Sequence, residues 1–143
     1  MLPIALPIAI TQGDPAGIGP EIVAKAFRDA PDLSRGCFAV GDLATLRRAA
    51  RCIVAPGEPI LPVAQLTSLD EVQRLPSRCL PVWPLAELNG PAPYGMVSGK
   101  AGQDAAACVV WAARAALHGE IAALVTAPLH KEALSMAGVP FPG

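Results

Sequence analysis

Charged residues are scarce in this chain of 143 residues, and the scarcity narrows its possible functions. Asp, Glu, Lys and Arg make up 16% of the sequence, whereas soluble domains average about 25%. Disordered proteins are rich in charge and poor in apolar residues, so a hydrophobic content of 52% excludes that class. The formal net charge of −1 provides no basic field, which argues against nucleic acid as a partner.

Long uninterrupted apolar runs and a basic leader are also lacking. No segment reaches the roughly 18 apolar residues that a membrane helix needs, so we expect no membrane partner. The apolar start of the chain has no basic region and contains Pro3 and Pro7, which argues against a secretory signal peptide. These absences favour a cytoplasmic protein. The high apolar content suggests that part of the surface lies against more protein.

Paired cysteines are missing, although the chain contains four cysteines. Cys37, Cys52, Cys79 and Cys108 show no Cys-x-x-Cys spacing, and each lies within an apolar stretch. This pattern predicts reduced core thiols and not disulfides or zinc ligands. Only two histidines occur, and no cluster of Asp, Glu or Cys surrounds either one, so we predict no metal ligand in this chain.

Strand and helix patterns alternate along the chain and predict an α/β fold with a mostly parallel sheet. Apolar runs predict strands over residues 7–11, 36–40, 53–55 and 121–126, with the first and last of them buried. Start and stop signals predict helices over 20–29, 42–51, about 98–118 and about 129–137, the last capped by Gly138. Within the proline-rich segment 56–93, the sequence is compatible with two further short strands, over 62–66 and 79–82. We expect these two strands at a sheet edge, because proline cannot donate to a central ladder.

A glycine-rich segment, Gly13-Asp-Pro-Ala-Gly-Ile-Gly19, lies between the first predicted strand and the first predicted helix. We take Gly13, Gly17 and Gly19 as candidate cofactor-binding residues, because glycine lets the backbone approach a ligand and the helix start offers free N–H groups. Asp14 would lie at the carboxyl end of a strand, where open α/β sheets bind ligands, although it could equally close an Asx turn. The segment fits neither the Walker A nor the Rossmann pattern, and a tight strand–helix turn explains its glycines equally well.

The segment Thr126-Ala-Pro-Leu-His-Lys131 follows the last predicted strand, at the same edge of the sheet. The Thr126 hydroxyl, the His130 imidazole and the Lys131 ammonium could hold a phosphate or carboxylate, so all three are candidate substrate-site residues. The alternative is structural: Thr126 ends a strand, His130 caps a helix and Lys131 faces solvent. Without further information, the structural explanation is preferred.

A third segment, Tyr94–Gly102, leads into the helix with the clearest pattern. Ser98 is a good N-cap candidate. Lys100 near the helix start is unfavourable with the helix dipole, which hints at an anion nearby. Apolar residues between positions 105 and 116 recur at helical spacing and predict a buried face, with Asp104 lying off that face.

Three blocks of the sequence together resemble the 4-hydroxythreonine-4-phosphate dehydrogenase (PdxA) family of vitamin B6 biosynthesis. They are Ile10–Ile22, the helix start from Gly95 to Gly102, and Leu124–Gly143, and they occur in the family order. The resemblance implies an α/β/α sandwich similar to the isocitrate and isopropylmalate dehydrogenase fold, with two domains and a homodimeric assembly. Members of the family are much longer, so we expect residues 1–143 to be the N-terminal portion of such an enzyme. The fold would then be incomplete in this chain, with the second half of the enzyme absent.

The resemblance also implies the reaction. It is the oxidation of 4-phosphooxy-L-threonine by NAD or NADP, followed by loss of CO2 to give 3-amino-2-oxopropyl phosphate in pyridoxal phosphate biosynthesis. A divalent metal, typically zinc, would polarise the substrate alcohol. Neither His118 nor His130 matches a family ligand position, so the metal ligands are expected outside this chain. The Gly13–Glu21 loop and the Thr126–Lys131 segment would line the cleft. We expect the chain alone to be inactive.

Three other functions remain open. The first is a paralogous dehydrogenase of a phosphorylated sugar acid, such as phospho-threonate or phospho-erythronate. The second is a phosphotransacetylase-like acyltransferase, which shares the broad fold and needs no NAD. The third is a short, non-catalytic dimerising remnant. The main interpretation predicts a phosphorylated small-molecule substrate and a second subunit as partners, with no nucleic acid and no membrane.

Overall fold

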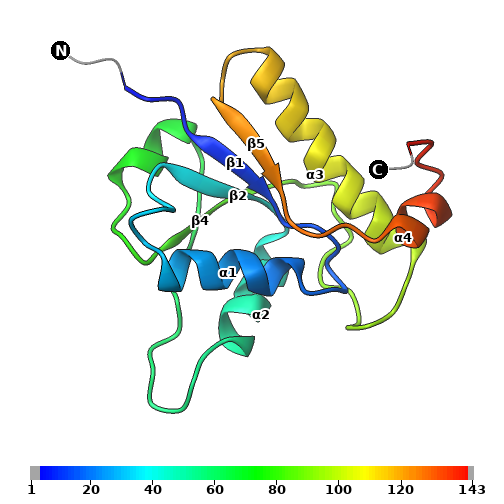
Figure 1. Ribbon diagram of the computed structural model, residues 1–143, viewed down its shortest axis with the longest axis horizontal. Helices are drawn as coiled ribbons and strands as arrows, with labels where there is room; N and C mark the ends of the chain where they lie inside the picture. The colour runs from blue at the N-terminus through cyan, green and yellow to red at the C-terminus, as the bar shows by residue number, and fades with distance from the viewer. Residues whose placement is uncertain (1–3, 142–143) are drawn as a thin grey trace.

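Five parallel strands form one sheet in the computed structural model, which describes residues 4–141. The spatial order is β3-β4-β2-β1-β5, and every neighbouring pair is parallel (Figure 1). The strands are β1 (Ile8–Thr11), β2 (Cys37–Gly41), β3 (Val63–Gln65), β4 (Leu80–Pro84) and β5 (Ala123–Thr126). The predicted α/β fold with a parallel sheet is therefore confirmed. The predictions about Pro3 and about the last two residues of the chain lie outside the described residues.

Helices cover both faces of this sheet. They are α1 (Gly19–Asp29), α2 (Leu43–Cys52), the 3-10 helix η1 (Leu69–Arg74), α3 (Gly99–Leu117) and α4 (Lys131–Met136). One apolar cluster joins α1 and α2 to one face, and a second cluster joins α3 to the other face (Figure 1). The layers are helix, sheet and helix, as the α/β/α prediction requires. Among residues 4–141, no helix is both long and apolar enough to cross a bilayer.

Short polar residues and glycine set several helix ends where the sequence predicts them. The Asp42 carboxylate accepts a hydrogen bond from the Thr45 backbone N–H at 2.7 Å and so begins α2. The Ser98 hydroxyl accepts one from the Ala101 N–H at 3.1 Å and begins α3. Gly138 follows α4 with a φ of +76°, a conformation that favours glycine.

Two strand predictions are wrong. Residues 53–55 form no strand, because the Ile53 N–H donates to the Ala49 carbonyl at 3.2 Å and closes α2 instead. β5 was predicted to be buried, but it is an edge strand with most of its residues exposed, and Val125 is 51% exposed. Apolar composition predicts burial, whereas the neighbouring elements decide it.

The expected edge position of both proline-rich strands holds for β3 only. β4 lies inside the sheet, between β3 and β2. The Leu80 N–H points to β3, where it donates to the Pro62 carbonyl at 2.8 Å, so by alternation the nitrogen of Pro81 faces β2. Pairing of β4 with β2 begins only at Val82, one residue later. Proline is tolerated in this interior strand because its nitrogen meets no ladder partner.

The buried face of α3 differs from its prediction at one residue. Asp104, expected off that face, is only 2% exposed. Its carboxylate accepts hydrogen bonds from the Asn89 backbone N–H at 2.9 Å and from the Asn89 side-chain amide at 2.7 Å. Burial raises the pKa of the Asp104 carboxyl. The long loop before α3 folds over this side of the helix, which the helical pattern alone does not reveal.

The four cysteines are free, and three of them fit the prediction of core thiols. Cys79 and Cys108 are buried and Cys37 is half-buried. Burial raises the pKa of the Cys108 thiol to about 12. Cys52 contradicts the prediction, because it lies exposed at the last turn of α2, with its sulfur 3.2 Å from the Tyr94 hydroxyl.

Candidate functional site

The chain reverses its direction across the sheet beside β1. From β1 it passes through α1 to β2 on one side, and after β4 it returns through α3 to β5 on the other side. Open α/β sheets bind ligands in the crevice outside the carboxyl ends of the strands at such a reversal. β1 and β5 end in register, with Thr11 level with Thr126. The glycine-rich loop follows β1, and the segment 126–131 begins at the end of β5. Both predicted site segments therefore start at this crevice.

A cavity of about 350 Å³ occupies this position, and we call it the switch-point cavity. Its walls come from the glycine-rich loop, the loop before α3 and the segment after β5. Its volume is within the range of small-molecule sites, and most of its lining is apolar. The lining residues are Asp14, Ala16, Gly17, Ile18, Gly95, Met96, Val97, Pro128, Leu129 and His130. The three segments with candidate motifs thus meet at one place.

Two of the predicted glycines are required by packing between the segments. Gly13 has a φ of +74°, and a Cβ there would lie 2.5 Å from the Pro128 carbonyl oxygen. A Cβ on Gly19 would lie 2.5 Å from the Gln12 carbonyl oxygen and 3.3 Å from the Ala127 Cβ. Neither glycine lines the switch-point cavity. Gly13 lets the glycine-rich loop approach the segment after β5, and Gly19 lets the start of α1 pack closely on Gln12 at the end of β1.

Gly17 and Asp14 do line the cavity. A Cβ on Gly17 would make only an ordinary contact, 3.6 Å from the Asp14 carbonyl oxygen. Asp14 is 5% exposed as a residue, and its Oδ1 accepts a hydrogen bond from the Ala16 N–H at 2.7 Å. This bond closes the Asx turn that the sequence offered as an alternative. The turn also fixes a carboxylate in the cavity wall.

His130 is the one candidate in the segment after β5 that lines the cavity. Its Nδ1 accepts a hydrogen bond from the Ala133 N–H at 3.4 Å, so it caps α4 as the structural alternative predicted. Thr126 and Lys131 are exposed and do not line the cavity. The hydroxyl, imidazole and ammonium groups are therefore not gathered around this cavity.

The start of α1 adds anion-binding capacity beside the cavity. Its N-cap residue is Ile18, whose side chain has no acceptor for the first N–H groups of the helix. Uncapped N–H groups at a helix start attract phosphate or carboxylate. Glu21 in the first turn opposes such an anion through its charge.

Arg48 on α2 reaches the site, although the sequence gives no indication of it. Its Nη1 donates to the Ala92 carbonyl at 2.7 Å, and its Nη2 donates to the Pro15 carbonyl at 3.0 Å. The guanidinium lies 3.9 Å from the centre of the Tyr94 ring. An arginine on a surface helix normally faces solvent, and these partners lie 33 and 44 residues away in the sequence. No local pattern identifies such a contact.

The described residues do not form a complete metal site. Within residues 4–141, no group of three or more His, Cys, Asp or Glu side chains could hold a metal ion. Asp14 and His130 in the cavity wall are too few ligands for a closed zinc site. No chemical step through a metal follows from these residues.

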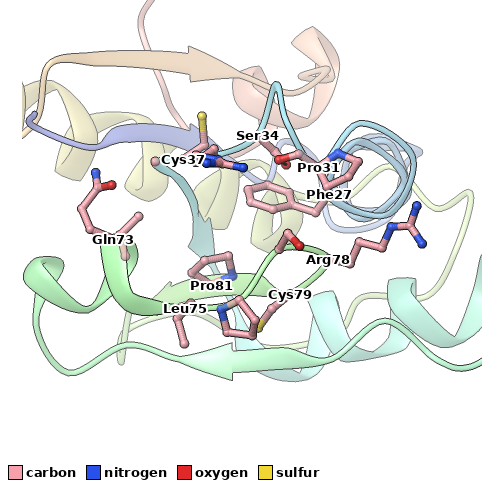
Figure 2. Close-up of a pocket in the computed structure, with 14 residues that line it drawn as sticks. Phe27, Pro31, Ser34, Cys37, Gln73, Leu75, Arg78, Cys79 and Pro81 are labelled. Atoms are coloured by element: carbon pink, nitrogen blue, oxygen red, sulfur yellow. Dashed lines mark hydrogen bonds between the residues drawn. The ribbon is translucent and has the colours of Figure 1, made fainter.

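A second cavity lies at the opposite ends of the strands, and we call it the amino-edge cavity. Its volume is about 420 Å³, and it holds none of the predicted site residues. Figure 2 shows Phe27 and Pro31 on one wall, Pro81 and Cys79 on the other, and Gln73 and Arg78 at its two ends. Parallel sheets place their ligand sites at the other ends of the strands. The amino-edge cavity is therefore the weaker candidate despite its size.

Comparison with known proteins identifies relatives along nearly the whole chain. The family model of the pyridoxal phosphate biosynthetic protein PdxA matches residues 34–143. The 4-hydroxythreonine-4-phosphate dehydrogenase of Beijerinckia indica is 36% identical over 137 residues, which cover 96% of this chain and 39% of that protein. The D-threonate 4-phosphate dehydrogenase of Salmonella typhimurium is 40% identical over 140 residues, which cover 95% of this chain and 41% of that protein.

A solved structure agrees with these sequence matches. The 4-hydroxythreonine-4-phosphate dehydrogenase of Klebsiella pneumoniae superposes with a TM-score of 0.82 at 35% identity, covering 97% of this chain and 42% of that chain. The chain therefore spans about 40% of the length of the relatives that it matches. The alignment with the Beijerinckia indica protein covers 96% of this chain, whereas the family model begins at residue 34, after the glycine-rich loop.

Proposed function

The chain belongs to the PdxA family, and on that premise we propose that it is the N-terminal portion of a two-domain dehydrogenase. The substrate is 4-phosphooxy-L-threonine. Its C3 alcohol gives a proton to solvent and a hydride to NAD, and the resulting β-keto acid loses CO2 to form 3-amino-2-oxopropyl phosphate. The names of the relatives support dehydrogenation of a phosphorylated small molecule. The main structural support for this proposal is that three separate segments meet at the switch-point cavity.

In this proposal the chain contributes binding and orientation. The Asx turn at Asp14 holds the glycine-rich loop against the cavity, and Gly17 leaves room for a ligand at the wall. The uncapped start of α1 receives an anionic group of the substrate or cofactor. His130 supplies an imidazole in the cavity wall formed by the segment after β5. The nicotinamide cofactor, when bound, accepts the hydride.

We place the remaining parts of the active site outside residues 1–143. These parts include the ligands of a divalent metal, expected to be zinc. We also propose a cytoplasmic homodimer. Exposed apolar side chains support further covering of this chain, since Leu117 is 86% exposed and Met136 is 58% exposed.

The test is a substrate comparison with the full-length protein in which these residues form the N-terminal portion. We expect NADH formation with 4-phosphooxy-L-threonine and none from residues 1–143 alone. Turnover by the isolated residues would contradict the division of the active site between two portions. Nicotinamide binding by the full-length protein, followed by fluorescence, would exclude the acyltransferase alternative because acyl transfer needs no NAD.

A second substrate is favoured by one observation. The D-threonate 4-phosphate dehydrogenase of Salmonella typhimurium is 40% identical to this chain, against 36% for the Beijerinckia indica 4-hydroxythreonine-4-phosphate dehydrogenase. Next to the carboxylate, D-threonate 4-phosphate carries a hydroxyl group, whereas 4-phosphooxy-L-threonine carries an ammonium group. A higher kcat/KM for D-threonate 4-phosphate would therefore assign the sugar-acid reaction.

A further inference from the structure

Arg48 bridges two loops that form different walls of the switch-point cavity, and we propose that it is a positioning residue for the ligand bound there. This inference rests on the proposed function of the cavity. One guanidinium nitrogen holds the Pro15 carbonyl, one residue before Ala16 in the first wall. The other holds the Ala92 carbonyl, three residues before Gly95 in the second wall.

The same two loops also contact each other directly. The Gly95 N–H donates to the Ala16 carbonyl at 2.8 Å, and both residues line the cavity. Tyr94, next to Gly95, stacks on the guanidinium with a distance of 3.9 Å to its ring centre. The loops are thus joined at two points, one within the cavity wall and one immediately behind it. Arg48 provides the second point.

The loop that carries Ala92 depends on such an anchor. Residues 85–98 contain no helix or strand, and side chains tie them down at a few places, among them Asn89, which donates to the Asp104 carboxylate. A long irregular segment is mobile unless side chains restrain it. A shift of this loop would move Met96 and Val97 relative to the glycine-rich loop. Arg48 therefore controls the width of the cavity without lining it.

Only arginine can make this set of contacts. Its planar guanidinium directs several N–H donors in fixed directions and stacks on an aromatic ring, whereas a lysine ammonium is a single charged point. The buried Nε of Arg48 has no hydrogen-bond partner among the described residues.

Substitution of Arg48 in the full-length protein tests the inference. We expect Arg48→Ala to lower kcat/KM for the phosphorylated substrate by about 10- to 100-fold, because the cavity walls lose their relative position. Added guanidinium ion should restore part of this loss, whereas ammonium ion should not. Arg47→Ala is the matched control, because Arg47 is exposed on the same helix and makes none of these contacts. It should leave kcat/KM unchanged.

Several outcomes would overturn the inference. If Arg48→Ala lowers the thermal midpoint but leaves kcat/KM at the wild-type value, the residue is only structural. If Arg48→Ala fails to fold, Tyr94→Leu removes the stacking contact and keeps the arginine, and we then expect a smaller loss in the same direction. Tyr94→Phe loses only the hydroxyl near the Cys52 sulfur and should keep the wild-type kcat/KM. An unchanged kcat/KM for folded Tyr94→Leu would also refute the positioning role.

Hydrogen exchange separates this inference from the proposed function. Arg48→Ala should accelerate amide exchange in residues 16–18 and 94–97 together, and Arg47→Ala should accelerate neither. If the wild-type protein shows no NAD reduction with either substrate, the proposed function fails, and the exchange result alone decides the bridging role of Arg48. Unchanged exchange in either loop would refute that role.

Discussion

The switch-point cavity and the amino-edge cavity lie at opposite ends of the sheet, and the larger of these two is the weaker candidate. The amino-edge cavity has a volume of about 420 Å³ and the switch-point cavity about 350 Å³. Only the switch-point cavity gathers the glycine-rich loop, the loop before α3 and the segment after β5, and backbone hydrogen bonds join these segments to one another. Volume measures empty space, whereas convergence of distant segments shows where the fold positions groups for a ligand.

Backbone conformation separates the two regions in the same way. At the switch point, glycine occupies the position where the chain has a positive φ and approaches Pro128 closely. At the amino edge, two residues have a positive φ. Gly36, with a φ of +76°, has no atom of the described residues closer than 3.4 Å to an added Cβ, and Arg78, with a φ of 56°, is a residue type that adopts it at a cost. The backbone at the switch point thus packs so closely that only glycine fits at Gly13. At the amino edge, the backbone position of Arg78 accepts a side chain.

The largest predicted effect is that of Gly13→Ala. Its Cβ would overlap the Pro128 carbonyl and impose an unfavourable φ, so we expect a loss of about 3 kcal/mol or more in the free energy of unfolding. Gly57→Ala is the control, because Gly57 has a φ of +82° with no atom of the described residues within 4 Å of the added Cβ. It should cost about 1 kcal/mol. Equal losses in chemical denaturation would show that the two segments do not need this close approach.

The next effect concerns the loop that closes the switch-point cavity. Asp104→Ala removes the acceptor of the Asn89 backbone and side-chain N–H groups, so we expect a loss of about 2 kcal/mol in the free energy of unfolding. Exchange of the 85–98 loop should also accelerate. A loss below about 0.5 kcal/mol would show that this carboxylate does not anchor the loop.

The same carboxyl predicts a pH dependence. Burial raises the pKa of Asp104, so the folded state holds this proton more tightly than the unfolded state. The stability of wild type relative to Asp104→Asn should therefore fall as the pH rises above about 4, and level off once the folded carboxyl has ionised. Denaturation curves over this range measure the difference. A relative stability that rises with pH would contradict the raised pKa.

A smaller effect is expected at the amino-edge cavity. Arg78→Gly relieves a positive φ, and we expect a gain of about 0.5 kcal/mol after the larger entropy of glycine in the unfolded chain is included. The kcat/KM of the full-length protein should not change. A reduced kcat/KM would give the amino-edge cavity a role in the reaction and would break the contrast between the two cavities.

The smallest effect concerns the order in which the four cysteines react with a labelling reagent. Burial raises the pKa of Cys37 and Cys79 at the amino-edge cavity, and holds the pKa of Cys108 at about 12. The exposed Cys52 should therefore react first with an alkylating reagent at mildly alkaline pH. Mass spectrometry of the native protein gives the order. Faster labelling of Cys108 would contradict the packing of α3 on the sheet.

Local patterns predicted the position of the candidate site but not its internal contacts. The strand endings and the glycine-rich loop follow from residues close together in the sequence, and parallel strands bring their ends to one edge. The bridge from Arg48 to Ala92 and the burial of Asp104 both depend on how an irregular loop folds over helices. Such long-range contacts carry no periodic signal. The false strand at 53–55 has a local origin instead, because a helix end and a short strand share an apolar pattern.

The most direct test of the central claim is to fill each cavity in the full-length protein and compare the kcat/KM values. Gly17→Leu enters the switch-point cavity from a position without backbone strain, and Ser77→Leu enters the amino-edge cavity. We predict a loss of about 100-fold for Gly17→Leu, because the ligand is displaced, and no change for Ser77→Leu. A loss confined to Ser77→Leu, or equal values for both variants, would contradict the assignment of the site to the carboxyl ends of β1 and β5.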